Sequence, residues 1–244
     1  MDISFIQQNK PILAMLHLKG TDPQDKLERA KREAAIYFEN GVDAVIAEDY
    51  FGNYHDVENV LKFLQNEYPE KCYGVNILNN FHRSYELAAM YGASFMQVDS
   101  LAGHLPPYLD IAYGKMIEAY RSLGKVAVIG GVRFKYQPVL SGRTLEEDMA
   151  LGVTRADAIV VTGEGTGMQT SSEKISAFRQ LTKNTPLIVG AGMTPDTVKE
   201  KLSVADGAIV GSYFKDTYKD TGDVDPTHVK EFMEIVFQLR QDSI

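Results

Sequence analysis

The sequence predicts a single (β/α)8 barrel, a fold of the α/β class, over residues 1–244. Short apolar runs rich in β-branched residues alternate with longer segments of helical periodicity along the chain. The runs begin roughly 20 to 30 residues apart, which is the length of one strand, one helix and two loops. A length of 244 residues suits one such barrel. The eight runs predicted as strands are Ile12–Leu18, Ala44–Ala47, Cys72–Ile77, Phe95–Val98, Val126–Val132, Ala158–Val161, Leu187–Val189 and Ala208–Val210.

A repeat of two β/α units supports the number eight. Each even-numbered run follows a small or turn-forming residue that ends the preceding helix, whereas odd-numbered runs tend to begin after Lys or Pro. A closed eightfold barrel is expected to leave such a repeat four times over. An open doubly wound sheet of about five or six strands is the alternative. The four signatures are Gly41–Ala44, Tyr91–Ser94, Arg155–Ala158 and Val204–Gly207.

Helix start signals lie between the runs. A capping side chain followed by proline is typical of a first helical turn, and Thr with Glu three residues later forms a capping box. Residues Asp216–Asp225, rich in Asp, Thr and Gly, are instead predicted to form an extended barrel loop or a mobile flap. Helices are predicted to begin at Asp22-Pro23, at Thr144 with Glu147, at Thr194-Pro195 and at Asp225-Pro226.

Composition and charge exclude several kinds of partner. A net charge of −8 and a pI of about 5.2 disfavour binding to phosphate backbones and anionic lipid. No apolar run approaches the roughly 18 residues of a membrane span. The single cysteine, Cys72, cannot form an internal disulfide and suits a reducing compartment. We therefore expect a cytoplasmic protein that binds a small molecule, with no nucleic acid and no membrane insertion, and we leave a homo-oligomer open.

Polar or small residues follow nearly every predicted strand. In a barrel the loops after the strands carry the chemistry, whereas the opposite rim contributes stability. Because loops are polar in general, this pattern indicates where a site would lie rather than what it does. The residues at the strand ends are His17, Glu48, Asp49, Asn76, Asp99, Arg133, Lys135, Thr162, Gly163, Glu164, Gly190–Gly192, Gly211 and Ser212.

Glu48, Asp99, Lys135 and His17 are the candidates for catalysis. Carboxyl groups in different environments can divide acid work from base work, and barrel geometry points either Glu48 or Asp49 inward, not both. A lysine in a barrel mouth can form a Schiff base or neutralise negative charge, and a histidine can transfer protons. The alternatives are a carboxylate that caps a turn, a surface lysine paired with a loop acid, and a hydrogen-bonded rim histidine.

Glycines after the last two strands predict an anion site. Gly190 and Gly192 follow the seventh strand, and Gly211 and Ser212 follow the eighth, so their backbone amides can converge on a phosphate. A helix that begins near Ser212 would add its positive end. Tight turns after the strands are the alternative explanation for the glycines. The other residues predicted to bind substrate are Asn76, Thr162 and Gly163.

Two further expectations concern metals and the fifth strand. The histidines show no HxH or HExxH spacing, so we predict no metal site and no other cofactor. Glu48, Asp99 and His17 nevertheless leave a divalent metal open. Alternation along the fifth strand predicts that Arg133 and Lys135 point to the same side.

Motifs spread over most of the chain are typical of one family. They are Leu16–Leu18, Gly41–Ala44 with Glu48, Gly74–Asn80, Ala156–Gly163 with Thr166-Gly167, Ala205–Ser212 with Phe214-Lys215, and Val224-Asp225. Together they resemble the BtpA/SgcQ family. The resemblance implies a phosphate-binding TIM barrel, and the family takes its name from a cyanobacterial factor linked to photosystem I biogenesis. It therefore implies either an enzyme or an assembly factor.

Three positions depart from the pattern of that family. The family has Glu-Asn after the second strand, where this sequence has Glu48-Asp49. It has Lys-His after the fifth strand, where Lys135 precedes Tyr136 here, and the asparagine of the fourth strand is Asp99. These differences predict a divergent member with its own substrate.

We expect an enzyme that acts on a small phosphorylated sugar or nucleoside-like metabolite. The glycines would bind the phosphate, while Glu48, Asp99 and Lys135 act through proton transfer, aldol-type cleavage or glycosidic cleavage. The isomerases of tryptophan and histidine biosynthesis share this architecture, but their Cys/Asp pair has no equivalent here. The alternative is a non-catalytic biogenesis or assembly factor, which would need an exposed apolar patch.

Overall fold

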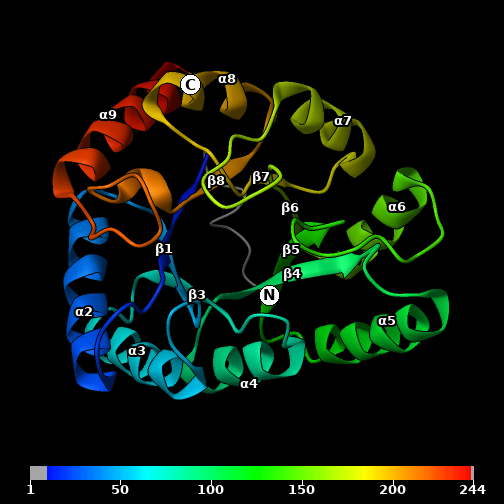
Figure 1. Cartoon of the computed structure of the whole chain (residues 1–244), viewed down its shortest axis with the longest axis horizontal. Coiled ribbons are helices and arrows are strands. Elements are labelled where there is room, and N and C mark those ends of the chain that lie inside the picture. The colour runs from blue at the N-terminus through cyan, green and yellow to red at the C-terminus, as the bar shows by residue number, and fades with distance from the viewer. Residues whose placement is uncertain (1–9, 243–244) are drawn as a thin grey trace.

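Residues 10–242, the part of the chain that the computed structural model describes, form one closed barrel of eight parallel strands (Figure 1). Strands pair in sequence order, and β8 closes the barrel on β1. The predicted fold is confirmed, and the open sheet is excluded. The predicted domain limits also include residues 1–9 and 243–244, which lie outside the described part. The strands are β1 (Ile12–Leu16), β2 (Ala44–Glu48), β3 (Cys72–Asn76), β4 (Phe95–Ala102), β5 (Ala127–Val132), β6 (Ala158–Val161), β7 (Leu187–Val189) and β8 (Gly207–Val210).

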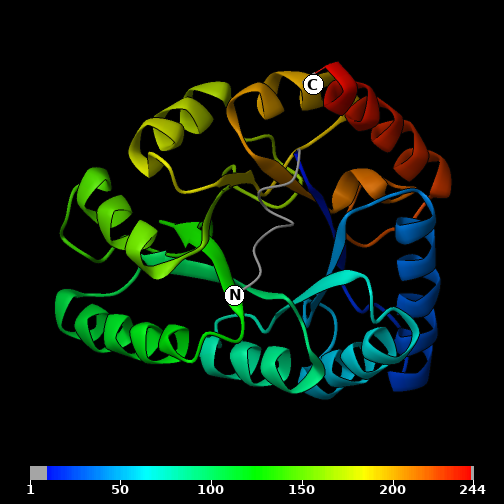
Figure 2. The ribbon, with the colours of Figure 1, turned by 180° about the vertical axis from the view of Figure 1, so that it is seen from behind.

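The helices of the described residues form a ring outside the barrel, as the view from behind shows (Figure 2). Within residues 10–242, no helix combines the length and the apolar character that crossing a bilayer requires. The helices are α2 (Pro23–Glu39), α3 (Tyr54–Glu67), α4 (Phe81–Tyr91), α5 (Pro107–Ser122), α6 (Leu145–Arg155), α7 (Ser172–Thr182), α8 (Pro195–Val204) and α9 (Pro226–Asp242), with a 3-10 turn, η1 (Ser212–Phe214), before α9.

Side-chain caps fix where several helices begin, as predicted. Asp22 accepts hydrogen bonds from first-turn backbone N–H groups of α2, and Thr144 and Glu147 form the reciprocal capping box of α6. Helices α8 and α9 begin at the predicted prolines, Pro195 and Pro226. Each cap ends a loop at a defined residue, so the loops that surround the barrel mouth have fixed lengths.

Two apolar layers hold the barrel together. Inward-facing residues such as Ile46, Phe95 and Ile129 form a core inside the barrel. The opposite faces of the strands pack against the helices in a second core, to which Val45 and Phe232 belong. Because strand side chains alternate in direction, the last inward position of each strand lies directly above the inner core at the barrel mouth.

Strand β4 extends beyond the predicted end at Val98 and reaches Ala102. Its pairing with β5 shifts register twice near this end, as a β-bulge does. Glycines in β5 allow the close approach, because a Cβ on Gly130 would lie 2.7 Å from the carbonyl oxygen of Val98, and one on Gly131 would lie 2.6 Å from that of Asp99. Polar residues interrupt the apolar run after Val98, which hid the extension in the sequence.

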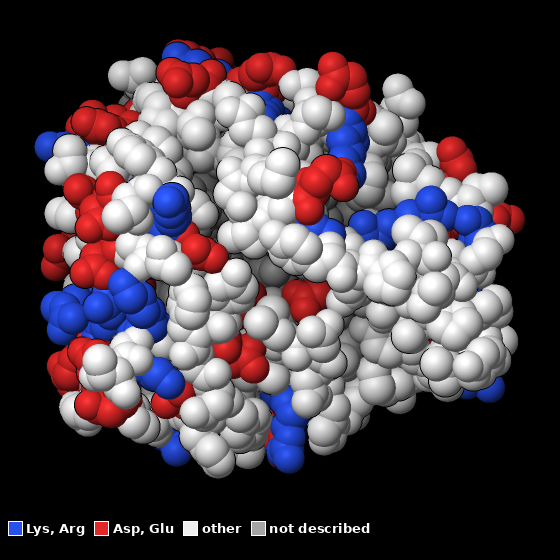
Figure 3. Space-filling model, viewed as in Figure 1, with Lys and Arg blue, Asp and Glu red and all other residues white. Residues whose placement is uncertain are grey.

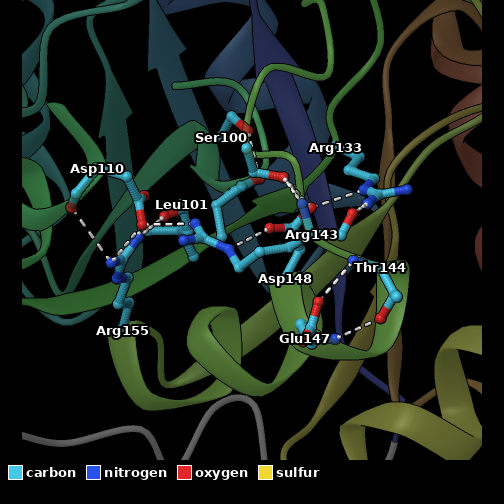
Figure 4. A network of polar contacts seen from close by, with 11 residues as sticks. Ser100, Leu101, Asp110, Arg133, Arg143, Thr144, Glu147, Asp148 and Arg155 are labelled. Carbon is cyan, nitrogen blue, oxygen red and sulfur yellow. Dashed lines mark hydrogen bonds and ion pairs between the residues drawn. The ribbon is translucent and has the colours of Figure 1, made fainter. Parts of the chain in front are cut away.

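A buried ion-pair network joins the end of β4 to the loop after β5 (Figure 4). Asp148 of α6 is fully buried and accepts hydrogen bonds from Arg133 Nε at 2.8 Å and Arg143 Nε at 2.9 Å. Asp110 of α5 pairs with Arg143 at 2.6 Å and with Arg155 at 2.7 Å. Arg155 also donates to the backbone of β4. These contacts fix the β5–α6 loop against the barrel.

The backbone at Arg133 differs from the sequence prediction. β5 ends at Val132, and Arg133 adopts a left-handed φ of 50°. The strand ends at Val132 as predicted, but its alternation does not continue to Lys135. Arg133 pairs with Asp148, while Lys135 lines the central pocket. The prediction that Arg133 and Lys135 share one side is wrong, and Arg133 instead anchors the loop that carries Lys135.

Asp148→Asn is expected to lower the free energy of unfolding by about 3 kcal/mol at pH 7, because two guanidinium groups lose their buried carboxylate. Burial opposes ionisation of Asp148, but hydrogen bonds from Arg133, Arg143 and Ser141 outweigh it and lower the pKa of Asp148. A lowered pKa in the folded state stabilises the fold above the unfolded pKa. The difference between the two proteins should therefore shrink below about pH 4. Urea unfolding measures it.

Glu118→Gln, at an exposed position of α5, is the control for this measurement. It is expected to change the free energy of unfolding by less than about 0.5 kcal/mol. An Asp148→Asn protein with the stability of the wild type at pH 7 would show that the network does not hold the fold.

Candidate functional site

A pocket of about 800 Å³ opens at the carboxyl ends of the strands, and the face seen in Figure 1 is hollowed near its centre beside acidic side chains (Figure 3). Met15, Val160 and Ile209 of the inner core form part of its floor. This volume suits a small metabolite. The predicted site residues that line the pocket are His17, Glu48, Asp99, Lys135, Thr162, Gly190, Gly192, Gly211 and Ser212.

Two predicted substrate-binding residues, Asn76 and Gly163, lie outside this lining. Asn76 is buried and donates a hydrogen bond to Glu48, so it contacts a lining residue and does not itself line the pocket. A Cβ on Gly163 would lie 2.8 Å from the carbonyl oxygens of Met168 and Gln169. Gly163 therefore lets the β6–α7 loop fold back on itself, and it does not line the pocket.

One amide group holds the two central carboxyl groups. Asn76, the last residue of β3, donates from Nδ2 to Glu48 Oε1 at 2.8 Å and to Asp99 Oδ1 at 3.3 Å. Asp99 also accepts a hydrogen bond from the backbone N–H of Asn79 at 3.2 Å. Asp49 accepts from the backbone of the β3–α4 loop at 2.9 Å. Glu48 is therefore the inward residue of the pair, and Asp49 is not.

The two central carboxyl groups lie in different electrostatic environments. Burial and repulsion from Asp99 raise the pKa of Glu48 to about 8, so Glu48 holds a proton at neutral pH. Burial also raises the pKa of Asp99, but hydrogen bonds from Asn76 and Asn79 oppose that rise. A protonated Glu48 beside an Asp99 with two N–H donors provides an acid and a base in different environments.

His17 lies directly after β1, and its Nε2 is 3.5 Å from Glu48 Oε2. Burial and the positive charge of Lys215 lower the pKa of His17 to about 3. With His17 neutral and Glu48 protonated, this contact at pH 7 joins two uncharged groups and is not an ion pair. The imidazole ring also packs against Tyr50 at a centroid distance of 5.2 Å. His17 is therefore placed to orient the proton of Glu48.

Lys135 reaches the pocket from the β5–α6 loop. Its Nζ lies 3.4 Å from Thr166 Oγ1 and 5.8 Å from the centroid of the Tyr136 ring. Burial lowers the pKa of Lys135, and the carboxyl groups of Glu48 and Asp99 act in the opposite direction. A lysine with a lowered pKa can stabilise developing negative charge or act as a nucleophile.

Backbone amides after β7 and β8 form another wall of the pocket. Gly192, Gly211 and Ser212 line it, and their N–H groups donate to no acceptor within residues 10–242. Gly190 differs, because its N–H donates to the carbonyl oxygen of Val161 at 2.7 Å. The N–H of Gly190 is already used in a hydrogen bond between β6 and the end of β7. Gly190 therefore does not belong to the predicted cluster of amides.

The two glycine loops have different tolerance for a side chain. Gly192 has a φ of 68°, and a Cβ there would overlap the backbone of Gln169. At Gly211 the nearest atom to a Cβ would be His17 Cε1 at 3.4 Å, an ordinary contact. Ser212 begins only the single turn η1. The helix predicted to begin near Ser212 is this 3-10 turn, but three residues give no sizeable helix dipole, so the predicted positive helix end is wrong.

Several pocket residues were not identified from the sequence. Gln97 of β4 lies one inward position before Asp99, and strict alternation backwards from Asp99 would have found it. Tyr136 and Thr166 lie at the mouth, where the Thr166 N–H donates to Tyr136 Oη at 2.7 Å. Loop residues such as these follow no period, so only the folded chain brings them together.

The polar loop Asp216–Asp225 lies beside β1 at the pocket mouth (Figure 1). Tyr218 of this loop lines the pocket, and Asp220 lies next to His17 and Tyr50. An antiparallel bridge closes the base of the loop. It is therefore an extended barrel loop at the site, and its mobility stays a prediction.

Fold and site together define an α/β barrel protein with buried ionisable groups at the carboxyl ends of its strands. The chain belongs to the BtpA family, whose sequence model matches residues 8–238. It is similar to an uncharacterised protein of Thermococcus kodakarensis, with 29% identity over 97% of this chain and 99% of that protein. It is also similar to the photosystem I biogenesis protein BtpA of Synechocystis, with 26% identity over 93% of this chain and 88% of the relative.

Solved enzyme structures share the fold at low sequence identity. Phosphoribosyl anthranilate isomerase of Thermus thermophilus has a TM-score of 0.63 and 14% identity, over 94% of this chain and 99% of the isomerase. The N-acetylmannosamine-6-phosphate 2-epimerase of Clostridium perfringens has a TM-score of 0.58 and 14% identity, over 85% of this chain and 89% of the epimerase. Because this fold carries many chemistries, the likeness shows the architecture alone.

Proposed function

We propose that this protein is an enzyme that acts on a small phosphorylated sugar or nucleoside-like metabolite by acid–base chemistry. Glu48 and Asp99 carry the proposal, because they share the amide of Asn76 and lie in different electrostatic environments. Glu48 gives a proton to one atom of the substrate, and Asp99 removes one from another. Lys135 stabilises the negative charge that develops between these steps. Such proton transfers serve an isomerase, a lyase or an enzyme that cleaves a glycosidic bond.

The phosphate end of the substrate is assigned to the amides of Gly192, Gly211 and Ser212. Backbone N–H groups bind phosphate without a side-chain cation, which suits a protein of net charge −8. Asp196 and Glu231 line the same pocket and both lie near Tyr213. Their charges disfavour an anion beside Tyr213, so the proposal is restricted to these three amides.

The similar structures support a phosphorylated substrate. One is named for a phosphoribosyl compound, and the other is named for N-acetylmannosamine-6-phosphate. Among residues 10–242, no group of three or more His, Cys, Asp or Glu side chains is arranged to hold a metal ion. The proton transfers proposed here use only side chains of this protein. Independence from cofactors, a cytoplasmic location and a homo-oligomer stay predictions from the sequence.

A non-catalytic biogenesis or assembly factor is the second candidate. The relative from Synechocystis is named as a photosystem I biogenesis protein. Helix α5 exposes Tyr108, Leu109 and Ile111 close together in the sequence, and neighbouring exposed apolar side chains are typical of a protein contact. The buried acid–base centre favours the enzyme, because a docking protein has no use for a protonated carboxyl group in a pocket.

Gly211→Asp is expected to abolish the stabilisation of the protein by inorganic phosphate and phosphorylated metabolites. The variant places a carboxylate beside the proposed amides at a position where a Cβ fits. A ligand at about 100 times its Kd stabilises a native protein by about 2.7 kcal/mol, and thermal-shift screening detects such a gain. Gly211→Asn, of the same shape without charge, should retain part of the response. A full response to phosphate in Gly211→Asp would refute the anion site.

Lys135→Met is expected to lower kcat at least about 100-fold on the substrate that this screen identifies, because the developing charge loses its counter-ion. Lys115→Met, at an exposed position of α5, is the matched control and should keep full activity. Borohydride trapping with substrate distinguishes a Schiff base from charge stabilisation. Activity within a few-fold of the wild type would remove Lys135 from the mechanism.

A further inference from the structure

A buried amide in the pocket has an oxygen without a partner. Gln97 lies one inward position before Asp99 in β4, and it is only 6% exposed. Its Oε1 is buried and forms no hydrogen bond within residues 10–242, and the side chain lines the pocket. An unpaired buried amide oxygen lowers stability. Gln97 is therefore poorly explained by a structural role.

No donor within residues 10–242 reaches the amide oxygen of Gln97. Met15, Val160 and Ile209 line the same pocket and belong to the apolar inner core. The residue that pairs with Gln97 in β5 is Ile129. None of these side chains has a polar hydrogen. A molecule that fills the pocket can supply the hydrogen bond that Oε1 lacks.

We propose that Gln97 binds a hydroxyl group at the end of the substrate away from the phosphate, and that the substrate is a polyhydroxy sugar phosphate, not a nucleotide. This inference rests on the proposed function. A hydroxyl group donates to the amide oxygen of Gln97 and accepts from its NH2 group. A neighbouring hydroxyl or carbonyl group of the sugar then lies against Glu48 and Asp99.

The arrangement of the strands supports this orientation. In the closed barrel β4 and β8 lie on opposite sides, so Gln97 on β4 faces the amides of Gly211 and Ser212 across the pocket. A nucleobase needs flat apolar or aromatic surfaces. Of the Tyr and Phe side chains that line the pocket, Tyr50, Tyr136 and Tyr218 are exposed and Phe134 and Tyr213 are half-buried, and none belongs to the inner core. The inner-core residues that line the pocket, Met15, Val160 and Ile209, thus give a nucleobase no aromatic ring to stack on.

A residue kept for binding at the expense of stability has a measurable signature. Gln97→Met removes the unpaired amide and keeps the length of the side chain among apolar neighbours. The unliganded variant should therefore melt about 2–4 °C above the wild type. Gln97→Leu, a shorter apolar replacement, should also melt at or above the wild-type temperature. Gln65→Met, at an exposed position of α3, should leave the Tm unchanged.

Ligand binding is the second readout, measured with inorganic phosphate, ribose 5-phosphate, glucose 6-phosphate and uridine 5′-monophosphate. The wild type should bind at least one of the sugar phosphates more tightly than phosphate or the nucleotide. Gln97→Met should weaken that sugar phosphate about ten-fold and leave the affinity for phosphate unchanged. Gln65→Met should bind all four compounds as the wild type does.

Three results would overturn the assignment of Gln97. They are a lower Tm in both unliganded variants, an unchanged affinity of Gln97→Met for the sugar phosphate, and a wild type that binds neither sugar phosphate more tightly than phosphate or the nucleotide. A wild type without any response to phosphate would instead contradict the proposed anion site. The Tm comparison and the affinities for the two sugar phosphates would still decide the role of Gln97.

Discussion

The site depends on the amide of Asn76, whose two N–H bonds point to Glu48 and Asp99. Strand register fixes this arrangement, because β2 and β3 pair Glu48 directly with Asn76. Burial and mutual repulsion both favour the protonated form of a carboxyl group. Two buried carboxyl groups that share one neutral donor are therefore most stable when one of them is protonated. Protonation of Glu48 removes the repulsion and leaves an acid ready to react.

The rest of the barrel mouth is organised around this pair. The ion pairs of Asp148 fix the loop after β5, and the left-handed turn at Arg133 lets that loop present Lys135 to the carboxyl groups. Across the pocket, small residues after β7 and β8 leave backbone amides uncovered. One side therefore carries Glu48, Asp99 and Lys135, and the other carries uncovered backbone amides, which suits a substrate with a reactive end and an anionic end.

Much of the fold was readable from the sequence because strand periodicity and helix caps are local signals. The positions of Glu48 and Asp99 followed from the rule that barrel chemistry lies at strand ends. The bridging role of Asn76 did not follow, because it depends on the register between two strands. The contact between Asn76 and Asp99 could not be predicted either. The register shifts near the end of β4 place Asp99 inside a strand that the sequence predicts to end at Val98. Gly190 was misjudged because its N–H belongs to the barrel ladder.

The most direct test of this account is a carbon-detected NMR titration of the glutamate carboxyl groups. One glutamate carboxyl signal should titrate with a midpoint near the pKa of about 8 given for Glu48, and this signal should be absent from Glu48→Gln. If every glutamate of the wild type titrates below about pH 6, Glu48 is ionised at neutral pH. The acid–base assignment would then be contradicted.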